Sequence, residues 1–291
     1  MKPTKPDHSE PLVLASEKRR VGQTSLSTRG GAAFSELEKR LTRLSGVVVA
    51  YSGGMDSGFL ALMARRTLPN RMKAVFIQSA FIAEADARRA QEFAARFDLP
   101  LSVLQADVLS NPELRDNPDD RCYICKKMVV SLLKAEVPAG WALAEGSVTD
   151  DAGDYRPGKK ALREAGVLSP LEESGFSKAL VAEGLHFLEA AEFIRPSQSC
   201  LATRVPAGQR LSVERLKRID TGEAFLGQLG LSGFRLRDHD GLARIECAPE
   251  QIPLVLEHRA HLIETLRNLG FTHITLDLGG YRRGSTNRNH S

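Results

Sequence analysis

One stretch, VVVAYSGGMDSGFLALMARR at residues 47–66, constrains the fold more than any other part of the sequence. An apolar, β-branched run meets two glycines and small polar residues, and helical apolar spacing then resumes at once. The backbone amides of a turn that opens a helix form a concave anion site, which the helix dipole strengthens. The alternative is a plain glycine turn between a strand and a helix. The complete pattern SGGMDS favours phosphate binding.

Strand-like and helix-like segments alternate along most of the chain. The alternation predicts an α/β fold, a Rossmann-like parallel sheet with helices on both faces, which binds ligands beyond the carboxyl ends of its strands. The expected strands are 46–52, 73–79, 101–107, 141–147 and a short fifth at 167–171, and the expected helices are 56–67, 84–97 and 121–136.

The pattern changes after about residue 200. A helix is expected over 212–230, a hairpin over 234–247 with its turn at Asp240-Gly241, a helix over 249–269 and a strand over 271–280. This order predicts a smaller C-terminal α+β domain. We therefore divide the chain into a disordered tail (1–32), an ATP-binding domain (33–200) and a substrate-binding or oligomerisation domain (201–291).

Charge is concentrated at the two ends of the chain. The formal net charge is +4, and residues 1–30 and the last eleven residues each carry +3, which leaves −2 for the rest. A nucleic-acid-binding body is basic over a broad face, so we expect no nucleic acid partner. No apolar run approaches the roughly 20 residues of a membrane span, and the N-terminus lacks a signal-peptide core, so we expect a cytoplasmic protein.

The chain has four cysteines, and two of them, Cys122 and Cys125, form a CxxC pair. In a reducing compartment such a pair indicates metal or thiol chemistry. The pair opens a predicted helix and is flanked by Arg121, Lys126 and Lys127, an environment that lowers a thiol pKa. Zinc, redox and iron–sulfur sites all use CxxC, but a structural zinc site needs a second ligand pair, which is missing.

The other two cysteines have different surroundings. Cys200 lies in the polar segment RPSQSCLATRVPAG, whereas Cys247 ends an apolar run and is assigned to the core. Cys122, Cys125 and Cys200 together suggest a [4Fe–4S] cluster with one open iron. The alternative is that Cys200 is a nucleophile and the CxxC pair is secondary.

SGGMDS after a first strand resembles the PP-loop of enzymes that split ATP between its α- and β-phosphates. The wider match is to the LarE family of ATP-dependent sulfur transferases, which act in the synthesis of the nickel-pincer nucleotide. The match covers about residues 35 to 287, through SGGMDS, RCYICKK, DYRPGKKALREAGVLSPL, PSQSCLATRVPAG, FRLRDHDGLARIE and GFTHITLDLGGYRRGSTN.

The resemblance implies that ATP and Mg²⁺ activate a carboxylate of pyridinium-3,5-biscarboxylic acid mononucleotide, which is then converted to a thiocarboxylate. Asp56 would hold the Mg²⁺. The ATP site would also include the end of the second strand, residues 76–79. The nucleotide-binding residues expected from this resemblance are Ala50, Ser52, Gly53, Gly54, Asp56, Ser57, Gln78 and Gly146.

The resemblance also implies two sources of sulfur. Cys200 either gives up its own sulfur and becomes dehydroalanine, or joins Cys122 and Cys125 in holding a [4Fe–4S] cluster that carries sulfide. The cluster route is favoured because all three cysteines are present. The family further implies a homo-oligomer.

An anionic substrate needs fixed cations, and four are candidates. Arg235 and Arg237 alternate on one predicted strand and could present two guanidiniums together. The alternative interpretation is that both arginines lie on a solvent-exposed face of the hairpin. The other two candidates are Lys126 and Arg204.

Two departures from the family leave other functions open. Gly146-Ser147-Val148 replaces a Gly-Thr-Asn segment, and the approach to Cys200 lacks a Leu-Gly-Leu-Pro turn. One alternative is a PP-loop enzyme that thiolates tRNA. The net charge of −2 between the two basic ends argues against it, because tRNA binding needs a broad basic surface. Another is a non-catalytic nucleotide-binding protein with a structural metal at the CxxC pair.

Overall fold

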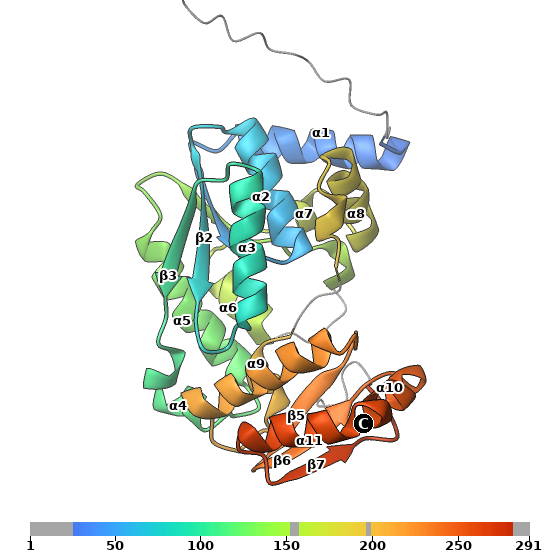
Figure 1. The fold of residues 1–291 in the computed structure, drawn as a ribbon. Helices are drawn as coiled ribbons and strands as arrows, with labels where there is room; N and C mark the ends of the chain where they lie inside the picture. The colour runs from blue at the N-terminus through green and yellow to red at the C-terminus, as the bar shows by residue number, and fades with distance from the viewer. Residues whose placement is uncertain (1–25, 152–156, 196–198, 282–291) are drawn as a thin grey trace, which may run out of the picture.

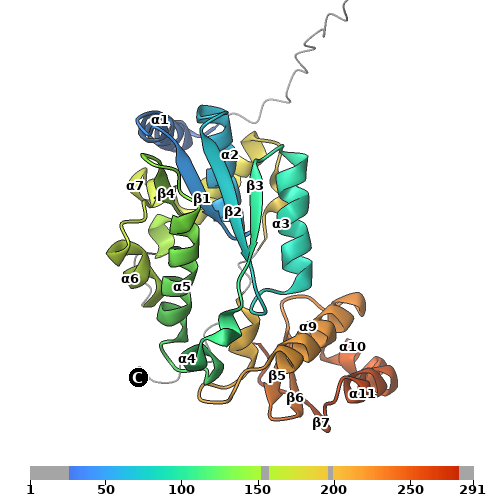
Figure 2. The same cartoon turned by 90° about the vertical axis from the view of Figure 1, so that its left-hand side faces the viewer.

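The structure is a computed structural model that describes residues 26–151, 157–195 and 199–281. Its largest sheet lies in the upper part of the molecule as drawn in Figure 1 and is formed by the predicted apolar runs. It is parallel throughout, with the strand order β3-β2-β1-β4 (Figure 2). The strands are β1 (Val47–Tyr51), β2 (Met72–Gln78), β3 (Leu101–Gln105) and β4 (Ala142–Ala144).

Both faces of this sheet are covered by helices (Figure 2). Alternate residues of β1 face opposite ways: Val47, Val49 and Tyr51 belong to one apolar cluster and Val48 belongs to another. The first cluster is completed by α1 (Thr28–Thr42), α2 (Met55–Thr67), α3 (Glu84–Arg96) and α8 (Lys178–Phe187), and the second by α5 (Arg121–Ala135) and α6 (Pro157–Glu164). The predicted α/β class is confirmed.

The C-terminal part forms a second, three-stranded sheet in the order β5-β6-β7. Its elements follow the expected order: α9 (Val213–Gln228), β5 (Arg235–His239), β6 (Leu242–Glu246), α10 (Ile252–Glu257), α11 (Arg259–Asn268) and β7 (His273–Leu276). Asp240 and Gly241 have φ angles of 55° and 89°, as a two-residue hairpin turn requires, so the predicted hairpin is confirmed.

Three local predictions differ from the structure. Residues 167–171 are not a strand: Leu168 makes a single bridge to Ala144, and α7 (Pro170–Glu173) begins at Pro170, which lacks an N–H for a ladder. The helix predicted over 249–269 is divided into η5 (Pro249–Gln251), α10 and α11, although its apolar spacing is continuous. The end of the predicted tail is helical, because α1 begins at Thr28 with Ser27 as its N-cap. Residues 1–25 lie outside the described residues.

Short helical segments complete the described chain, and two of them lie near the candidate site: η2 (Thr149–Asp151) and η4 (Leu201–Arg204). The others are η1 (Val108–Ser110), α4 (Pro112–Arg115) and η3 (Ala191–Phe193). In the described part of the chain, no helix combines the length and apolarity needed to cross a membrane.

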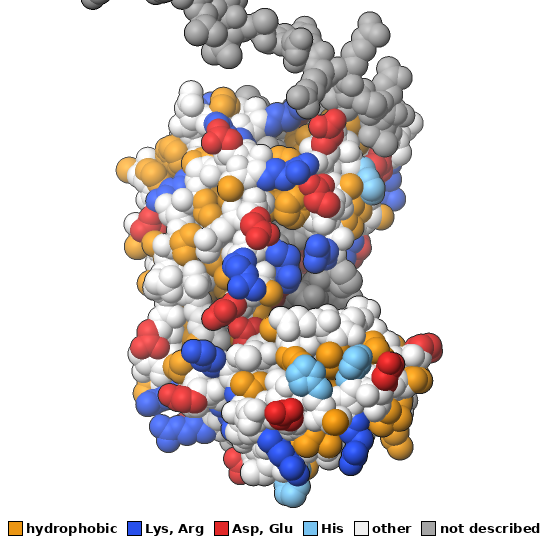
Figure 3. All heavy atoms as spheres, in the orientation of Figure 1, with side chains coloured by type: hydrophobic (Ala, Val, Ile, Leu, Met, Phe, Trp, Pro, Cys, Tyr) orange, Lys and Arg blue, Asp and Glu red, His pale blue; other side chains and the backbone are white. Residues whose placement is uncertain are grey.

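One of the two apolar clusters contains residues from both predicted domains. The apolar cluster that covers one face of the parallel sheet through Val48 and Val75 continues to Leu236 and Ile245 of the C-terminal sheet. On the face drawn in Figure 3, Lys, Arg, Asp and Glu side chains gather at the waist between the two parts.

Candidate functional site

The SGGMDS turn lies at the carboxyl end of β1 and opens α2. Gly53 has a φ of 77°, a left-handed conformation, and a Cβ there would lie 2.7 Å from the Cβ of Ala90 in α3. The Ser52 amide donates to Oγ of Ser57 at 3.1 Å, and Oγ of Ser57 donates to the Gly54 carbonyl at 3.1 Å. These contacts fix a tight turn whose following amides are the unpaired first N–H groups of α2, which suits an anion.

The loop after β4 presses against this turn. A Cβ on Gly146 would lie 2.7 Å from the Ser57 nitrogen and 2.9 Å from its Cα, so only glycine permits the approach. Two other predicted residues reach the same edge of the sheet: Ala50 is near the end of β1, and Gln78 is the last residue of β2. Of the predicted stretch 76–79, Phe76 is fully buried and belongs to the core.

Asp56, in the first turn of α2, lies near a lysine that a second carboxylate also approaches. Nζ of Lys178 lies 3.8 Å from Oδ2 of Asp56 and 4.0 Å from Oδ1 of Asp151. Asp151 is almost fully buried and accepts from the Val148 amide at 3.3 Å. That Asp56 binds Mg²⁺ stays a prediction, and its place in the first turn of α2 puts it beside the glycine turn. Lys178 was not predicted, because it is distant from the glycine loop in the sequence.

Cys200 is attached to the same edge of the parallel sheet. It precedes η4, and the amide of the next residue, Leu201, donates to the Phe81 carbonyl at 2.9 Å, just beyond β2. Oγ1 of Thr203 donates to the Cys200 carbonyl at 2.8 Å. Cys200 is therefore held by backbone contacts at the sheet edge where ligands of α/β folds bind.

Three thiols from two separate segments interact electrostatically at this place. Burial raises the pKa of Cys125 to about 11, with smaller upward contributions from Cys200 and Cys122. Burial also raises the pKa of Cys200, although the Arg121 guanidinium opposes the shift. The expectation of a lowered thiol pKa is therefore wrong for Cys125, because desolvation outweighs the nearby cations. The fourth cysteine, Cys247, is fully buried, as predicted.

The donor chemistry of the three cysteines suits iron, but their arrangement does not form a ready metal site. Within the residues that the structure describes, no group of three or more His, Cys, Asp or Glu side chains is placed to hold a metal ion. Cys122 is exposed, whereas Cys125 and Cys200 are partly covered.

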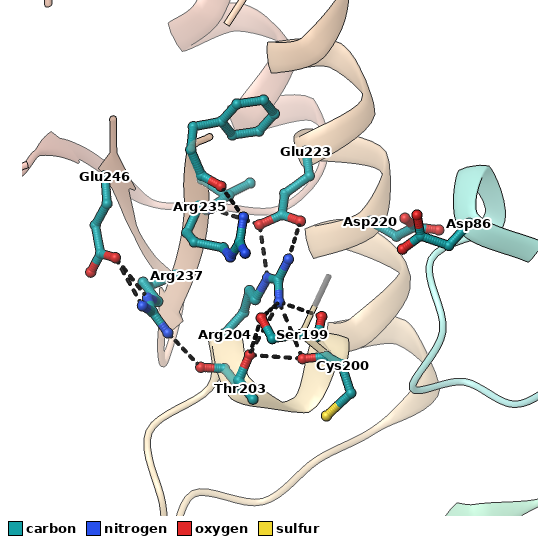
Figure 4. Close-up of polar contacts among 12 residues, drawn as sticks. Asp86, Ser199, Cys200, Thr203, Arg204, Asp220, Glu223, Arg235, Arg237 and Glu246 are labelled. Atoms are coloured by element: carbon teal, nitrogen blue, oxygen red, sulfur yellow. Dashed lines mark hydrogen bonds and ion pairs between the residues drawn. The ribbon is translucent and has the colours of Figure 1, made fainter. Parts of the chain in front are cut away.

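The predicted substrate cations Arg204 and Arg237 are buried in ion pairs (Figure 4). Arg204 donates to both carboxylate oxygens of Glu223, and its Nη1 donates to the Ser199 carbonyl at 2.7 Å. Arg237 donates twice to Oε2 of Glu246 and, at 2.7 Å, to the Thr203 carbonyl. Both guanidiniums therefore hold the segment around Cys200 against the C-terminal part, Arg204 through α9 and Arg237 through β5.

Arg235 is different, because no carboxylate of the described residues forms an ion pair with it. It is only 8% exposed, its Nη1 donates to the Phe234 carbonyl at 2.6 Å, and it lies over the Tyr281 ring at 4.7 Å. In the described ranges no Asp or Glu oxygen lies within ion-pair distance of it. Burial and the neighbouring Arg204 lower its pKa. The alternative of a solvated hairpin face is wrong for Arg235 and Arg237, which are both buried.

Lys126 lies on the helix that carries the CxxC pair, and its charge opposes the rise in the Cys125 pKa. Two acidic residues of α9 were missed by the sequence reasoning: Glu223, which pairs with Arg204, and Asp220, which accepts from the Glu84 amide at 3.0 Å. Their spacing of three residues puts them on one helix face, but nothing in the sequence indicates what that face meets.

Comparison with known proteins agrees with this geometry. The NAD synthase family matches residues 34–111, the part that contains the glycine turn. Pyridinium-3,5-bisthiocarboxylic acid mononucleotide synthase of Lactiplantibacillus plantarum is 32% identical over 250 residues, which cover 85% of this chain and 91% of that protein.

Two uncharacterised proteins are also similar. Protein slr1717 of Synechocystis sp. is 35% identical over 262 residues, 88% of this chain and 94% of its own length. Protein MJ0830 of Methanocaldococcus jannaschii is 29% identical over 238 residues, 81% of this chain and 90% of its own length. The identity to the synthase extends over most of the chain, and the glycine turn, the CxxC pair and Cys200 are all present. This protein belongs to the LarE family.

Proposed function

We propose that this chain is an ATP-dependent sulfur transferase that converts a carboxylate of pyridinium-3,5-biscarboxylic acid mononucleotide to a thiocarboxylate. The observation that carries the proposal is the hydrogen bond from the Leu201 amide to the Phe81 carbonyl. It attaches Cys200 to the sheet edge that also carries the glycine turn, so a nucleotide bound at the turn and a sulfur nucleophile would share one site. The relative in Lactiplantibacillus plantarum is named for this product.

The ATP step draws on the amides of α2 and on Asp56. The amides that follow Gly54 would bind phosphate oxygens, and Mg²⁺ held beside Asp56 would neutralise phosphate charge. Lys178, near Asp56 and Asp151, supplies a further positive charge beside the cradle. Attack of a substrate carboxylate oxygen on the α-phosphorus would form an acyl adenylate and release pyrophosphate.

The substrate carries a phosphate and carboxylates, and Arg235 supports its binding. The guanidiniums of Arg204, Arg235 and Arg237 are all buried, whereas within the described ranges only two carboxylates pair with them, Glu223 with Arg204 and Glu246 with Arg237. This excess of positive charge favours an anion, and Arg235 is the guanidinium with donors to spare. Lys126 is proposed as a further contact on the side of the CxxC pair.

The sulfur step is proposed to use Cys200. Its thiolate attacks the acyl adenylate carbon, forming a thioester and expelling AMP. Removal of the Cα proton of Cys200 then breaks its Cβ–Sγ bond, and the electron pair leaves with sulfur. The products are a thiocarboxylate and dehydroalanine at position 200, so each chain would act once.

A [4Fe–4S] cluster on Cys122, Cys125 and Cys200 stays a prediction, and no step above is routed through it. Such a cluster would supply an exchangeable sulfide and permit repeated turnover. Iron and acid-labile sulfide, measured after purification without oxygen, test it: about four irons per chain support the cluster, and an iron-free active protein excludes it. A homo-oligomer is likewise proposed and is tested by light scattering.

The proposed function is tested by supplying ATP, Mg²⁺ and the biscarboxylate mononucleotide to the wild type and to Cys200→Ser. We expect both to release pyrophosphate, and only the wild type to yield thiocarboxylate and to lose the mass of H₂S from residue 200. Cys247→Ala is the matched control, since that thiol is fully buried in the core. Thiocarboxylate formed by Cys200→Ser would contradict the role of Cys200. No pyrophosphate from any form would contradict the reaction itself.

A further inference from the structure

One buried side chain, that of Asn117, joins the two segments that carry the thiols. Asn117 lies between α4 and α5, shortly before the CxxC pair, and it is fully buried. Its φ angle of 54° is left-handed, a conformation that asparagine adopts far more readily than most residues. A polar side chain at such a buried position needs partners for each of its atoms.

The partners lie on the segment that follows Cys200. Nδ2 of Asn117 donates to the Val205 carbonyl at 3.2 Å and to the Pro206 carbonyl at 2.8 Å. The backbone carbonyl of Asn117 accepts from the Gly208 amide at 2.9 Å. Both hydrogens of the amide group are therefore used to hold the Cys200 segment.

The remaining atom of the side chain faces the CxxC helix. Oδ1 of Asn117 accepts from Nη1 of Arg121, the first residue of α5, and the same nitrogen lies 3.5 Å from the Ala202 carbonyl. A backbone hydrogen bond of 2.7 Å from the Leu211 amide to the Arg115 carbonyl extends the contact. Asn117 thus bridges the residue just before Cys122 and the loop just after Cys200.

We propose that Asn117 is a positioning residue that keeps Cys200 beside the CxxC pair. An amide is needed because a carboxylate would face two carbonyl oxygens, and an aliphatic side chain would take this donor away from the Val205 and Pro206 carbonyls. The purpose of this arrangement, holding Cys200 in place for sulfur transfer, rests on the proposed function. The arrangement itself does not.

The test measures the proximity of Cys122 and Cys200 in the full-length chain. In a Cys125→Ser background, dibromobimane becomes fluorescent when its two ends have reacted with both thiols, and monobromobimane reports the access of each thiol separately. Asn117→Asp keeps the size, the left-handed tolerance and the acceptor for Arg121, but loses the two donors. Asn117→Gly keeps only the backbone freedom. Asn111→Ala, which removes a local contact to the Glu113 amide in the same segment, is the matched control.

We expect cross-linking to slow by about tenfold in both Asn117 variants, because small displacements of a reacting group carry costs of that order. In both Asn117 variants, each thiol should react with monobromobimane at the rate seen in the Cys125→Ser parent. Asn111→Ala should cross-link at the rate of the same parent. If a variant is less stable than the Cys125→Ser parent, urea is added to the parent until the same fraction of both proteins is folded, and the two cross-linking rates are then compared. If Asn117→Asp cross-links as fast as the parent in this comparison, the proposal is overturned.

A second readout separates this proposal from the proposed function. With Cys125 restored, Asn117→Asp should release pyrophosphate at the wild-type rate and form thiocarboxylate about tenfold more slowly. If the wild type forms no thiocarboxylate, the proposed function fails, while the cross-linking rates still decide the role of Asn117.

Discussion

Glu223 holds Arg204 with both oxygens of its carboxylate, at 2.9 Å to Nε and 2.8 Å to Nη2. Arg204 is 3% exposed, and its Nη1 donates to the Ser199–Thr203 segment around Cys200. A helix of the C-terminal part therefore fixes the loop that bears the proposed sulfur donor.

Glu223→Ala should be strongly destabilising, because it leaves the Arg204 charge buried without its partner. The expected loss in the free energy of unfolding is about 3 kcal/mol or more, measured by urea denaturation. Glu192→Ala breaks an exposed ion pair of the same length with Arg96 and should cost less than about 1 kcal/mol. Similar losses of unfolding free energy in the two variants would show that the buried Arg204–Glu223 pair matters no more to stability than an exposed pair.

Gly146→Ala should weaken ATP binding. The added Cβ would meet the Ser57 nitrogen at 2.7 Å and push the loop after β4 away from the first turn of α2. We expect the Kd for MgATP, measured by calorimetry, to rise by about tenfold or more. Gly31→Ala is the control, since a Cβ there meets nothing within 4 Å and should slightly stabilise α1. Unchanged ATP affinity in Gly146→Ala would place the nucleotide elsewhere.

Asp220→Asn should make stability less dependent on pH. Burial raises the pKa of Asp220 above its ordinary value of 3.8, with further upward contributions from Glu84, Glu223 and Asp86, while the Glu84 amide lowers it. A raised folded-state pKa favours the protonated form, so this group stabilises the fold at acid pH and loses that stabilisation as pH rises through the folded-state pKa.

Asparagine keeps the acceptor for the Glu84 amide and carries no charge. Asp220→Asn should therefore match the wild type below the ordinary carboxyl range and exceed it in unfolding free energy at neutral pH. Urea denaturation at both pH values measures the difference, with the exposed Asp98→Asn as the control. The difference in unfolding free energy, variant minus wild type, should be larger at neutral pH than at acid pH. A smaller difference at neutral pH would contradict a raised pKa for Asp220.

Asp56→Asn should raise the Mg²⁺ requirement of pyrophosphate release. Removing one carboxylate charge beside the phosphate cradle weakens a hard cation site, and we expect the half-saturating Mg²⁺ concentration to rise by about tenfold. The protein should keep its fold by circular dichroism, and Asp98→Asn should titrate as the wild type does. An unchanged Mg²⁺ titration in Asp56→Asn would remove this residue from the metal site.

Local patterns in the sequence predicted the glycine turn, the alternation of strands and helices and the hairpin, because each depends on residues close in the chain. The side chains that hold Cys200 in place could not be predicted in this way. Glu223 and Asn117 meet partners far away in the sequence, and nothing around them indicates those partners. The pKa of Cys125 was misjudged for a related reason: the flanking cations are visible in the sequence, but the degree of burial is not.

The apolar cluster that runs from Val48 and Val75 to Leu236 and Ile245 means that the two parts cannot be exchanged as independent modules. A chimera joined at residue 200 would have to match the facing side chains of both partners, or it would open this shared core to water. Heating should accordingly melt both sheets in a single transition, and ATP bound at the glycine turn should raise the melting temperature of the C-terminal sheet as well.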